Sequence, residues 1–249
     1  MDYIIILIIF LYGICVGSFL NVCIFRIPNK INIVSKRSHC LHCGNVLKWY
    51  ELIPVFSYLF QKGKCRHCKN KLSKQYPFIE LLNGSAWVLI YFQFGFTYEC
   101  LLFCLCTSVL IVISTIDFKT FEIPIGCNIA ILVLGIARLA GDLAHWSMYV
   151  IGFFAISGFF YILYLATKGR GIGGGDIKLM AVAGLLLGWK LIILAMVLGC
   201  ILGSIIHIIL MKLQNKDRVL AFGPYLSMGI FIAMLFGDSI INWYITFIL

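Results

Sequence analysis

Long apolar runs separated by short polar segments make up almost the whole chain, and only one polar stretch is long. A helix needs roughly 20 apolar residues to cross a bilayer, and these runs do not alternate with polar residues. They therefore predict membrane helices and exclude a β-barrel. The expected spans are residues 3–25, 77–96, 100–116, 123–140, 147–167, 176–189, 191–211 and 226–248. The predicted fold class is an all-α polytopic membrane protein with about eight transmembrane helices.

The long polar segment divides the chain into three parts. Residues 1–25 are expected to form the first transmembrane helix, 26–76 a small loop module, and 77–249 a seven-helix membrane domain. The first run has no basic residue ahead of its apolar stretch and stays apolar up to Arg26. We therefore expect it to be retained as a helix rather than removed as a secretory signal.

Composition and charge set the orientation. Apolar residues make up 62% of the chain and charged residues only 12%, and the net charge is +10. With the amino terminus outside, 18 of the 20 Lys and Arg residues lie on the cytoplasmic side, which is the expected positive-inside distribution. Because these charges flank span ends instead of forming a groove with stacking aromatics, they indicate contact with membrane lipid and no nucleic-acid partner.

Four cysteines of the loop form two CxxC pairs, Cys40 with Cys43 and Cys65 with Cys68. Two such pairs can bring four thiolates to one tetrahedral Zn²⁺ ion. Two disulfides are the alternative, but the predicted orientation places the loop in the reducing cytoplasm, where disulfides rarely persist. A loop with few apolar residues gains much of its folding energy from such a metal, so we predict a structural zinc.

Glycines spaced four residues apart occur in three of the apolar runs. They are Gly13 with Gly17, Gly184 with Gly188, and Gly199 with Gly203. In membrane proteins this spacing marks helix faces that approach one another closely. We expect these glycines to serve helix packing.

Placing a carboxylate in the hydrocarbon core of a membrane costs free energy, so carboxylates in or beside the spans indicate function. The candidates are Glu80, Asp117, Glu122 and Asp176. Asp117 closes an apolar run, and Asp176 follows a glycine run and begins a short apolar stretch. Their expected depths in the membrane would allow the two side chains to meet. Two facing carboxylates share one proton and can hydrolyse a peptide, whereas a single intramembrane aspartate often makes a structural hydrogen bond or relays protons in a transporter.

The glycine run before Asp176 consists of Gly173, Gly174 and Gly175. Irregular backbone at membrane depth must be buried in protein or line a water-filled cavity. Glycines also leave room for another chain to approach. We expect these three residues to bind an extended substrate through their backbone, as an added strand.

Taken together, these motifs resemble those of the bacterial type IV prepilin peptidases, membrane aspartic proteases with a GxGD signature. The resemblance covers almost the whole chain and combines the two CxxC pairs with the motifs Gly17-Ser-Phe-Leu-Asn-Val, Arg26-Ile-Pro28, Tyr50-Glu-Leu-Ile-Pro54, Ile123-Pro124, Gly173-Gly-Gly-Asp176 and Phe222-Gly-Pro224. It implies that Asp117 and Asp176 are the catalytic pair. It also implies an enzyme of the bacterial inner membrane that removes the basic leader from prepilins or pseudopilins at the cytoplasmic face, in type IV pilus or type II secretion systems.

The same resemblance implies a second activity, methylation of the new amino terminus with S-adenosylmethionine as donor. Some relatives without the loop do not methylate, and this chain keeps the loop and all four cysteines, so we expect the activity to be retained. Glu80 and Asn83 lie on one helical face beside the loop and are candidates for binding the donor or the substrate amine. A polar cluster within the helix is the alternative.

Overall fold

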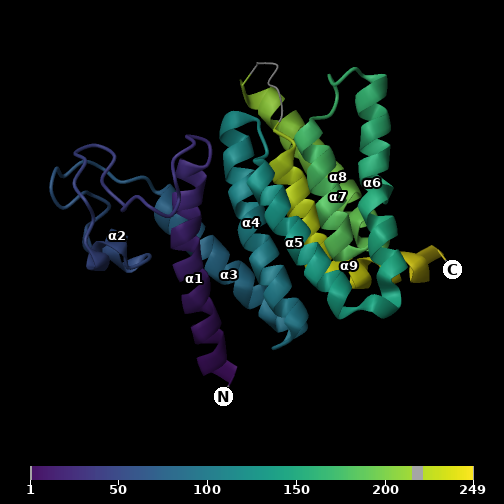
Figure 1. The fold of residues 1–249 in the computed structure, drawn as a ribbon, viewed down its shortest axis with the longest axis horizontal. Coiled ribbons are helices and arrows are strands. Elements are labelled where there is room, and N and C mark those ends of the chain that lie inside the picture. Colours follow the sequence, from purple (N-terminus) through teal and green to yellow (C-terminus); the bar gives the residue numbers. More distant parts are fainter. Residues whose placement is uncertain (1, 215–220, 249) are drawn as a thin grey trace. The chain divides into compact units, whose positions relative to one another are not determined.

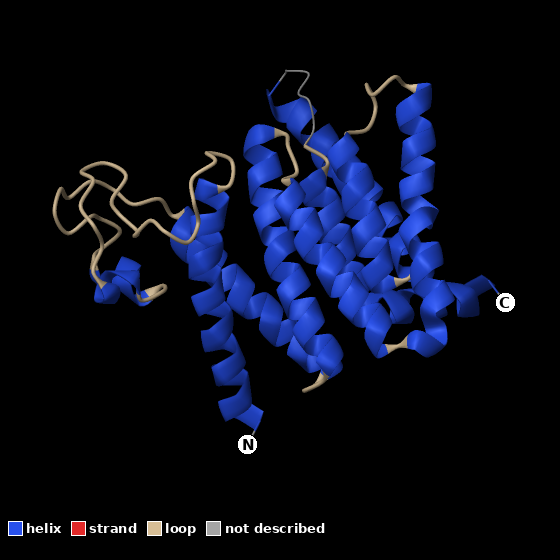
Figure 2. Cartoon of the chain, viewed as in Figure 1, coloured by secondary structure: helices blue, strands red, loops and turns tan. Residues whose placement is uncertain are grey.

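The protein is described by a computed structural model over residues 2–214 and 221–248, and within these ranges its regular elements are helices, with no strand (Figure 2). Each of the eight predicted apolar runs overlaps largely with one helix (Figure 1). These are α1 (Asp2–Arg26), α3 (Gln75–Phe94), α4 (Tyr98–Thr120), α5 (Ile125–Gly141), α6 (Trp146–Ala166), α7 (Gly174–Leu187), α8 (Trp189–Gln214) and α9 (Gly223–Ile248). Three short elements, η1 (Trp49–Leu52), α2 (Phe56–Phe60) and η2 (Leu143–His145), lie between them.

Five of the helices are long and apolar enough to cross a membrane. They cover Tyr3–Arg26, Tyr98–Thr120, Leu143–Ala166, Trp189–Ile209 and Gly223–Phe247. The prediction of an all-helical, multi-pass membrane protein is thereby confirmed, but the count of eight crossings is not. The helix α7 is short for a crossing, because its 14 residues rise only about 21 Å, less than a hydrocarbon core of about 30 Å.

The chain divides into two compact units, Met1–Val112 and Ile113–Leu249. In the first unit α1 packs against α3, so the first helix, the loop and α3 belong together. A Cβ atom on Gly13 would lie 2.7 Å from Cα of Gly84, and one on Gly17 would lie 2.7 Å from Cα of Glu80. The predicted packing role of these two glycines is confirmed.

Asn83 is a fully buried hydrogen-bonding centre of the first unit. Its Nδ2 donates to the carbonyl oxygen of Gly13 at 2.7 Å, and its Oδ1 accepts from Oγ of Ser108 at 2.8 Å. Trp87 Nε1 in turn donates to the same Ser108 Oγ at 3.0 Å. Since a buried amide must have its partners, these bonds connect α1, α3 and the part of α4 in this unit.

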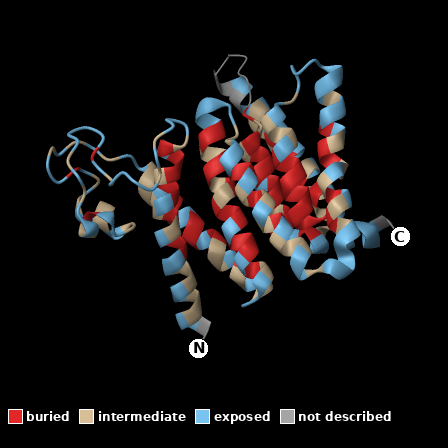
Figure 3. Cartoon of the chain, in the orientation of Figure 1, coloured by how far each residue is buried: buried red, intermediate tan, exposed pale blue. Residues whose placement is uncertain are grey.

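In the second unit the short helix α7 lies at the centre and packs against α5, α6, α8 and α9. Every residue from Leu179 to Leu187 is buried (Figure 3). Gly184 of α7 meets the backbone of Gly152 on α6 with no room for a side chain on either residue. Gly199 of α8 is likewise close to α9, where its Cβ would lie 3.2 Å from Cα of Leu226. Such close glycine contacts hold α7 against α6 and α8 against α9, which matters in a membrane because the hydrophobic effect does not drive helices together there.

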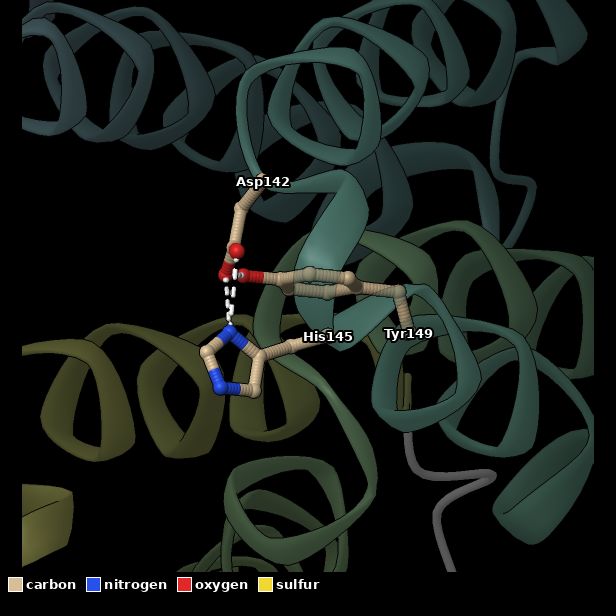
Figure 4. A network of polar contacts seen from close by, with 3 residues as sticks. All are labelled: Asp142, His145 and Tyr149. Atoms are coloured by element: carbon tan, nitrogen blue, oxygen red, sulfur yellow. Dashed lines mark hydrogen bonds and ion pairs between the residues drawn. The ribbon is translucent and has the colours of Figure 1, made fainter.

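The connection from α5 to α6 is closed by a polar network on Asp142 (Figure 4). The Tyr149 hydroxyl donates to Asp142 Oδ2 at 2.9 Å, and His145 Nδ1 lies 2.9 Å from Oδ1. The hydrogen bond to His145, followed by that to Tyr149, holds the pKa of Asp142 below its ordinary value. This stabilisation is therefore present at neutral pH and is lost on acidification through that lowered pKa.

Candidate active site and metal centre

Asp117 lies in the last turn of α4 and is buried, with 5% of its surface exposed. Its Oδ2 accepts a hydrogen bond at 2.9 Å from the backbone N–H of Gly223, the first residue of α9. The first N–H groups of a helix have no partner inside the helix and favour a negative charge. The carboxylate of Asp117 therefore caps α9.

Gly223 is a site residue to which the sequence analysis gave no role. A Cβ atom there would lie 2.7 Å from Oδ2 of Asp117, so the position requires glycine. The pair Gly223-Pro224 at the start of an apolar run is a signal for a helix start. It predicts the helix but not the carboxylate, because Asp117 is 106 residues away in the chain.

The chain leaves Asp117 through a tight end of α4. Phe121 has a left-handed backbone (φ 56°) and donates its N–H to the carbonyl oxygen of Asp117 at 2.8 Å. Ile123 follows, restricted to extended conformations by Pro124. A Cβ atom on Gly175 would lie 3.0 Å from Cβ of Ile123, so the start of α7 packs closely on this segment.

Asp176 lies in the first turn of α7 and is partly buried. Its Oδ2 accepts the N–H of Gly173 at 3.3 Å, so this carboxylate caps its own helix. Gly175, next to Asp176, packs on Ile123, which follows Asp117 closely in the chain, so the fold brings the two acids to the same region of the second unit. Glu122, the other acid of this region, is exposed on the connection between α4 and α5.

The glycine run differs from the expected strand. Only Gly173 is extended (φ −75°, ψ 144°), whereas Gly174 and Gly175 lie in the first turn of α7. The cap formed by Asp176 explains the difference, because it draws these two residues into the helix. In this structure the run offers the extended Gly173 beside the N–H groups of a helix start, and backbone binding of a substrate by the three glycines remains a prediction.

The four loop cysteines come together as predicted. The Sγ atoms of Cys40, Cys43, Cys65 and Cys68 all lie within 4.8 Å of one another. The sulfurs of Cys40 and Cys68 are 3.9 Å apart, close to the roughly 3.8 Å that a tetrahedral site with Zn–S bonds of about 2.3 Å requires. The donor set therefore fits one zinc ion with four thiolates.

The two CxxC pairs are built alike. The N–H of Cys40 donates to the carbonyl oxygen of Asn45 and that of Cys65 to Asn70, each at 2.8 Å. Isolated β-bridges, His39 with Val46 and Lys64 with Lys71, close the two turns. Each pair is thus a small knuckle whose shape depends on local sequence.

The cluster has the electrostatics of a cation site. The pKa of Cys40 is lowered to about 6, chiefly because the backbone N–H of Cys43 donates to its sulfur. A backbone hydrogen bond from Asn70 lowers the pKa of Cys68, but burial and the neighbouring sulfurs outweigh it and raise this pKa to about 11. Four thiolates this close repel one another, and a divalent cation removes that cost.

The knuckle turns allow a prediction about backbone strain. Gly44 and Lys69 occupy equivalent positions, both with left-handed backbones (φ 69° and 60°). A Cβ on Gly44 would meet nothing within 4 Å, so Gly44→Ala adds only conformational strain. We expect it to destabilise the zinc-bound module by about 1 kcal/mol, measured by chelator competition. Lys69→Ala adds no such strain and should change little; equal effects of the two would contradict this explanation.

The structure separates the two methyl-transfer candidates, Glu80 and Asn83. Glu80 lines a cavity of about 400 Å³ in the first unit, and its Oε2 accepts the N–H of Val55 at 2.7 Å. Asn83 is outside this cavity and uses its amide for helix contacts. The alternative of one polar cluster within the helix therefore does not describe both residues.

Fold and site together define a multi-pass helical membrane protein with a carboxylate pair in one unit and a four-cysteine cluster in the other. Two family profiles match the chain, that of the bacterial peptidase A24 N-terminal domain over residues 11–94 and that of the type IV leader peptidase family over residues 104–208. No solved structure shows significant similarity.

Similar proteins cover nearly the full length. A prepilin leader peptidase/N-methyltransferase of Bacillus subtilis (strain 168) is 36% identical, over 96% of this chain and 97% of that protein. Proteins of the same name from Pseudomonas aeruginosa and Legionella pneumophila are 31% and 32% identical, over 95% and 96% of this chain and 92% and 94% of theirs. The chain belongs to the type IV leader peptidase family, and the resemblance seen in its motifs is confirmed.

Proposed function

We propose that this protein is an intramembrane aspartic endopeptidase that removes the leader from prepilins or pseudopilins and then methylates the new amino terminus. The observation that carries the proposal is that Asp117 and Asp176 each cap a helix amino end in the same unit, in a family whose members are named for these two activities. S-adenosylmethionine is the methyl donor that we infer for the second activity.

The chemistry of cleavage follows from the sharing of one proton between the two carboxyl groups. Two neighbouring carboxylates cannot both ionise cheaply, so one is ionised and the other protonated. The ionised group takes a proton from water, which attacks the scissile carbonyl carbon. The protonated group donates to the carbonyl oxygen, and the proton taken from water later goes to the leaving amine. The helix caps at Gly223 and Gly173 hold the two carboxylates in position for these transfers.

The proposed topology places the amino terminus outside and the loop and active site toward the cytoplasm of a bacterial inner membrane. Its support is the charge distribution, in which 18 of 20 basic residues fall on one side of eight proposed crossings. In this topology 1–25 is the first span, 26–76 the zinc-binding loop and 77–249 the seven-helix peptidase region. A basic leader stays in the cytoplasm for the same reason, and the apolar segment after it lies in the bilayer.

We assign a structural role to zinc. Cys40, Cys43, Cys65 and Cys68 would hold the ion, which fixes the fold of the loop and leaves no open position for catalysis. Histidines near the cluster are then free of the metal.

Processing of a prepilin in cells tests the proposed function. Co-expressed with a prepilin in a bacterium that lacks its own leader peptidase, the wild-type protein should convert the precursor to the mature, methylated form, seen by gel mobility and mass spectrometry. A proton-coupled transporter that used Asp117 and Asp176 as a relay would leave the precursor intact, and that result would reject the proposal. No finding from the family comparison supports the transporter.

A substitution in the glycine run tests substrate binding there. A Cβ atom on Gly174 would meet nothing within 4 Å, so Gly174→Val fits the folded protein. Because the side chain would hold a substrate backbone away, we expect leader cleavage to fall at least about tenfold, with zinc content and membrane insertion unchanged. Gly158→Val on α6, also in open space, is the matched control. Near-normal turnover in Gly174→Val would mean that the glycine serves only the helix start.

A further inference from the structure

We propose that the acid-lined cavity of the first unit binds the methyl donor, a sulfonium compound of the S-adenosylmethionine class, with Glu80 and Glu51 facing its positive charge. The inference rests on the proposed methyl-transfer activity and assigns it a site. The acid-lined cavity is the space of about 400 Å³ bounded by Asn21 and Arg26 of α1, Glu80 of α3, Glu51 of η1 and the knuckle cysteines Cys40 and Cys65. Its volume falls within the roughly 300–1,000 Å³ typical of small-molecule sites.

The two carboxylates of the cavity are not neutralised by the protein. Glu80 and Glu51 are both largely buried, with 6% and 9% of their surfaces exposed. Each accepts a backbone N–H, Glu80 from Val55 and Glu51 from Lys48 at 2.8 Å. Neither forms an ion pair with any residue in the described ranges. A buried carboxylate without a cation is costly, so the cavity favours a positively charged ligand.

Two cationic residues, Lys71 and Arg26, line the cavity, and neither pairs with its carboxylates. Lys71 is exposed, and Arg26 has other partners. Arg26 is buried and directs its Nη1 to the carbonyl oxygens of Asn32 and Ile33, at 3.3 and 2.9 Å. It closes the turn after α1 instead of pairing with Glu80 or Glu51. The two buried carboxylates therefore remain available to a ligand.

Asn21 supplies a further acceptor. Its side chain is 4% exposed and its Nδ2 donates to the carbonyl oxygens of Gly17 and Tyr76, at 3.3 and 3.1 Å. Its Oδ1 is buried without a hydrogen-bond partner in the described structure, and Asn21 lines the cavity. Buried acceptors are nearly always bonded, so this oxygen suits an N–H or O–H group of the donor, such as its ammonium or ribose hydroxyl groups.

Strain next to Glu80 also points to a functional site. Val55 has a left-handed φ of 61° with ψ −54°, and the N–H of Phe56 donates to the carbonyl oxygen of Pro54 at 2.6 Å. This γ-turn is unfavourable for a β-branched residue. The bond from Val55 N–H to Glu80 holds the turn in place, and α2, which follows it, contributes Ser57 and Tyr58 to the cavity wall.

A second, larger cavity of about 600 Å³ on the loop is a poor site for the donor. Lys62, Lys64, Arg66 and Lys69 line it, and no acidic residue does. S-adenosylmethionine carries a sulfonium and an ammonium against one carboxylate, so its net charge is positive and this groove repels it. Of the two cavities, only the smaller, acid-lined cavity offers carboxylates to a cationic ligand.

The reaction itself changes the charge that the cavity holds. The lone pair of the amine attacks the methyl carbon, the carbon–sulfur bond breaks, and its electron pair goes to sulfur. The amine then gives up a proton to water, and the sulfonium becomes the neutral thioether of S-adenosylhomocysteine. Glu80 and Glu51 should therefore prefer the donor to the spent product.

This preference gives a test by binding. Isothermal titration calorimetry of the full-length, zinc-loaded protein would measure the affinities for S-adenosylmethionine and S-adenosylhomocysteine. Glu80→Gln keeps an acceptor for Val55 N–H but removes the charge. We expect it to weaken donor binding about tenfold or more and product binding about threefold or less, with zinc content unchanged. Glu51→Gln should act in the same direction. Asp238→Asn, exposed on α9, is the control and should change neither affinity.

Equal losses for both compounds, or unchanged donor affinity in both Gln variants, would overturn the assignment. Absence of methyl transfer and a different donor site would give different results. If the wild type binds neither compound and adds no methyl group to cleaved pilin, methyl transfer itself is wrong. If it methylates pilin while the Gln variants keep full donor affinity, only the choice of cavity is wrong.

Discussion

Purified Asp117→Asn and Asp176→Asn proteins are each expected to lose about a thousandfold in the rate of prepilin leader cleavage. Asparagine keeps the size of the side chain and an oxygen that can accept the capping N–H of Gly223 or Gly173. It cannot take a proton from water or donate one as an acid. The rate of leader release, followed by mass spectrometry under single-turnover conditions, measures the loss.

The control for these variants is Asp238→Asn, because Asp238 belongs to the same unit but is exposed on α9. It should cleave at the wild-type rate. All three variants should keep the zinc content and thermal midpoint of the wild type, which separates loss of chemistry from loss of fold. Cleavage retained in either Asp117→Asn or Asp176→Asn would defeat the two-carboxylate assignment.

Removal of one zinc ligand is expected to unfold the loop module while the membrane helices remain. Between residues 27 and 74 only Cys40, Glu51 and Cys65 are buried, so the module has almost no apolar core. Structural zinc supplies on the order of 10 kcal/mol, more than such a module can replace. Cys65→Ser should therefore lose its zinc, measured by elemental analysis, and the loop should become sensitive to limited proteolysis.

Cys200→Ser is the matched control, since Cys200 is an exposed free cysteine on α8. It should retain one zinc per chain and a protected loop. Full zinc occupancy after the double substitution Cys65→Ser/Cys68→Ser, or a wild-type protein purified without chelator that contains no zinc, would refute the metal site.

Features that depend on local sequence could be predicted. The apolar runs gave eight helices in the right places, because membrane helices satisfy their backbone within one segment. The knuckles could be predicted for the same reason, since each forms over a few residues around its CxxC pair. Gly13 and Gly17 were recognised as packing residues because their spacing places both on one helix face.

Features that depend on long-range contacts could not be predicted. The cap that Asp117 forms on the Gly223 N–H joins helices far apart in the chain, and no sequence pattern relates the two residues. Glu80 and Asn83 show a related limit: three residues along a helix differ by only about 60° around its axis. That spacing groups them, yet one faces a cavity and the other the neighbouring helices. Which of two such residues faces a cavity depends on the helices that pack against α3.

Cleavage by the purified protein alone tests the central claim most directly. Wild-type protein in lipid nanodiscs would be mixed with a purified full-length prepilin, and the products identified by mass spectrometry with and without S-adenosylmethionine. The account predicts one cut between the basic leader and the apolar segment in both samples, and one methyl group on the new amino terminus only when the donor is present. An intact prepilin under conditions in which the protein is folded and zinc-loaded would contradict it.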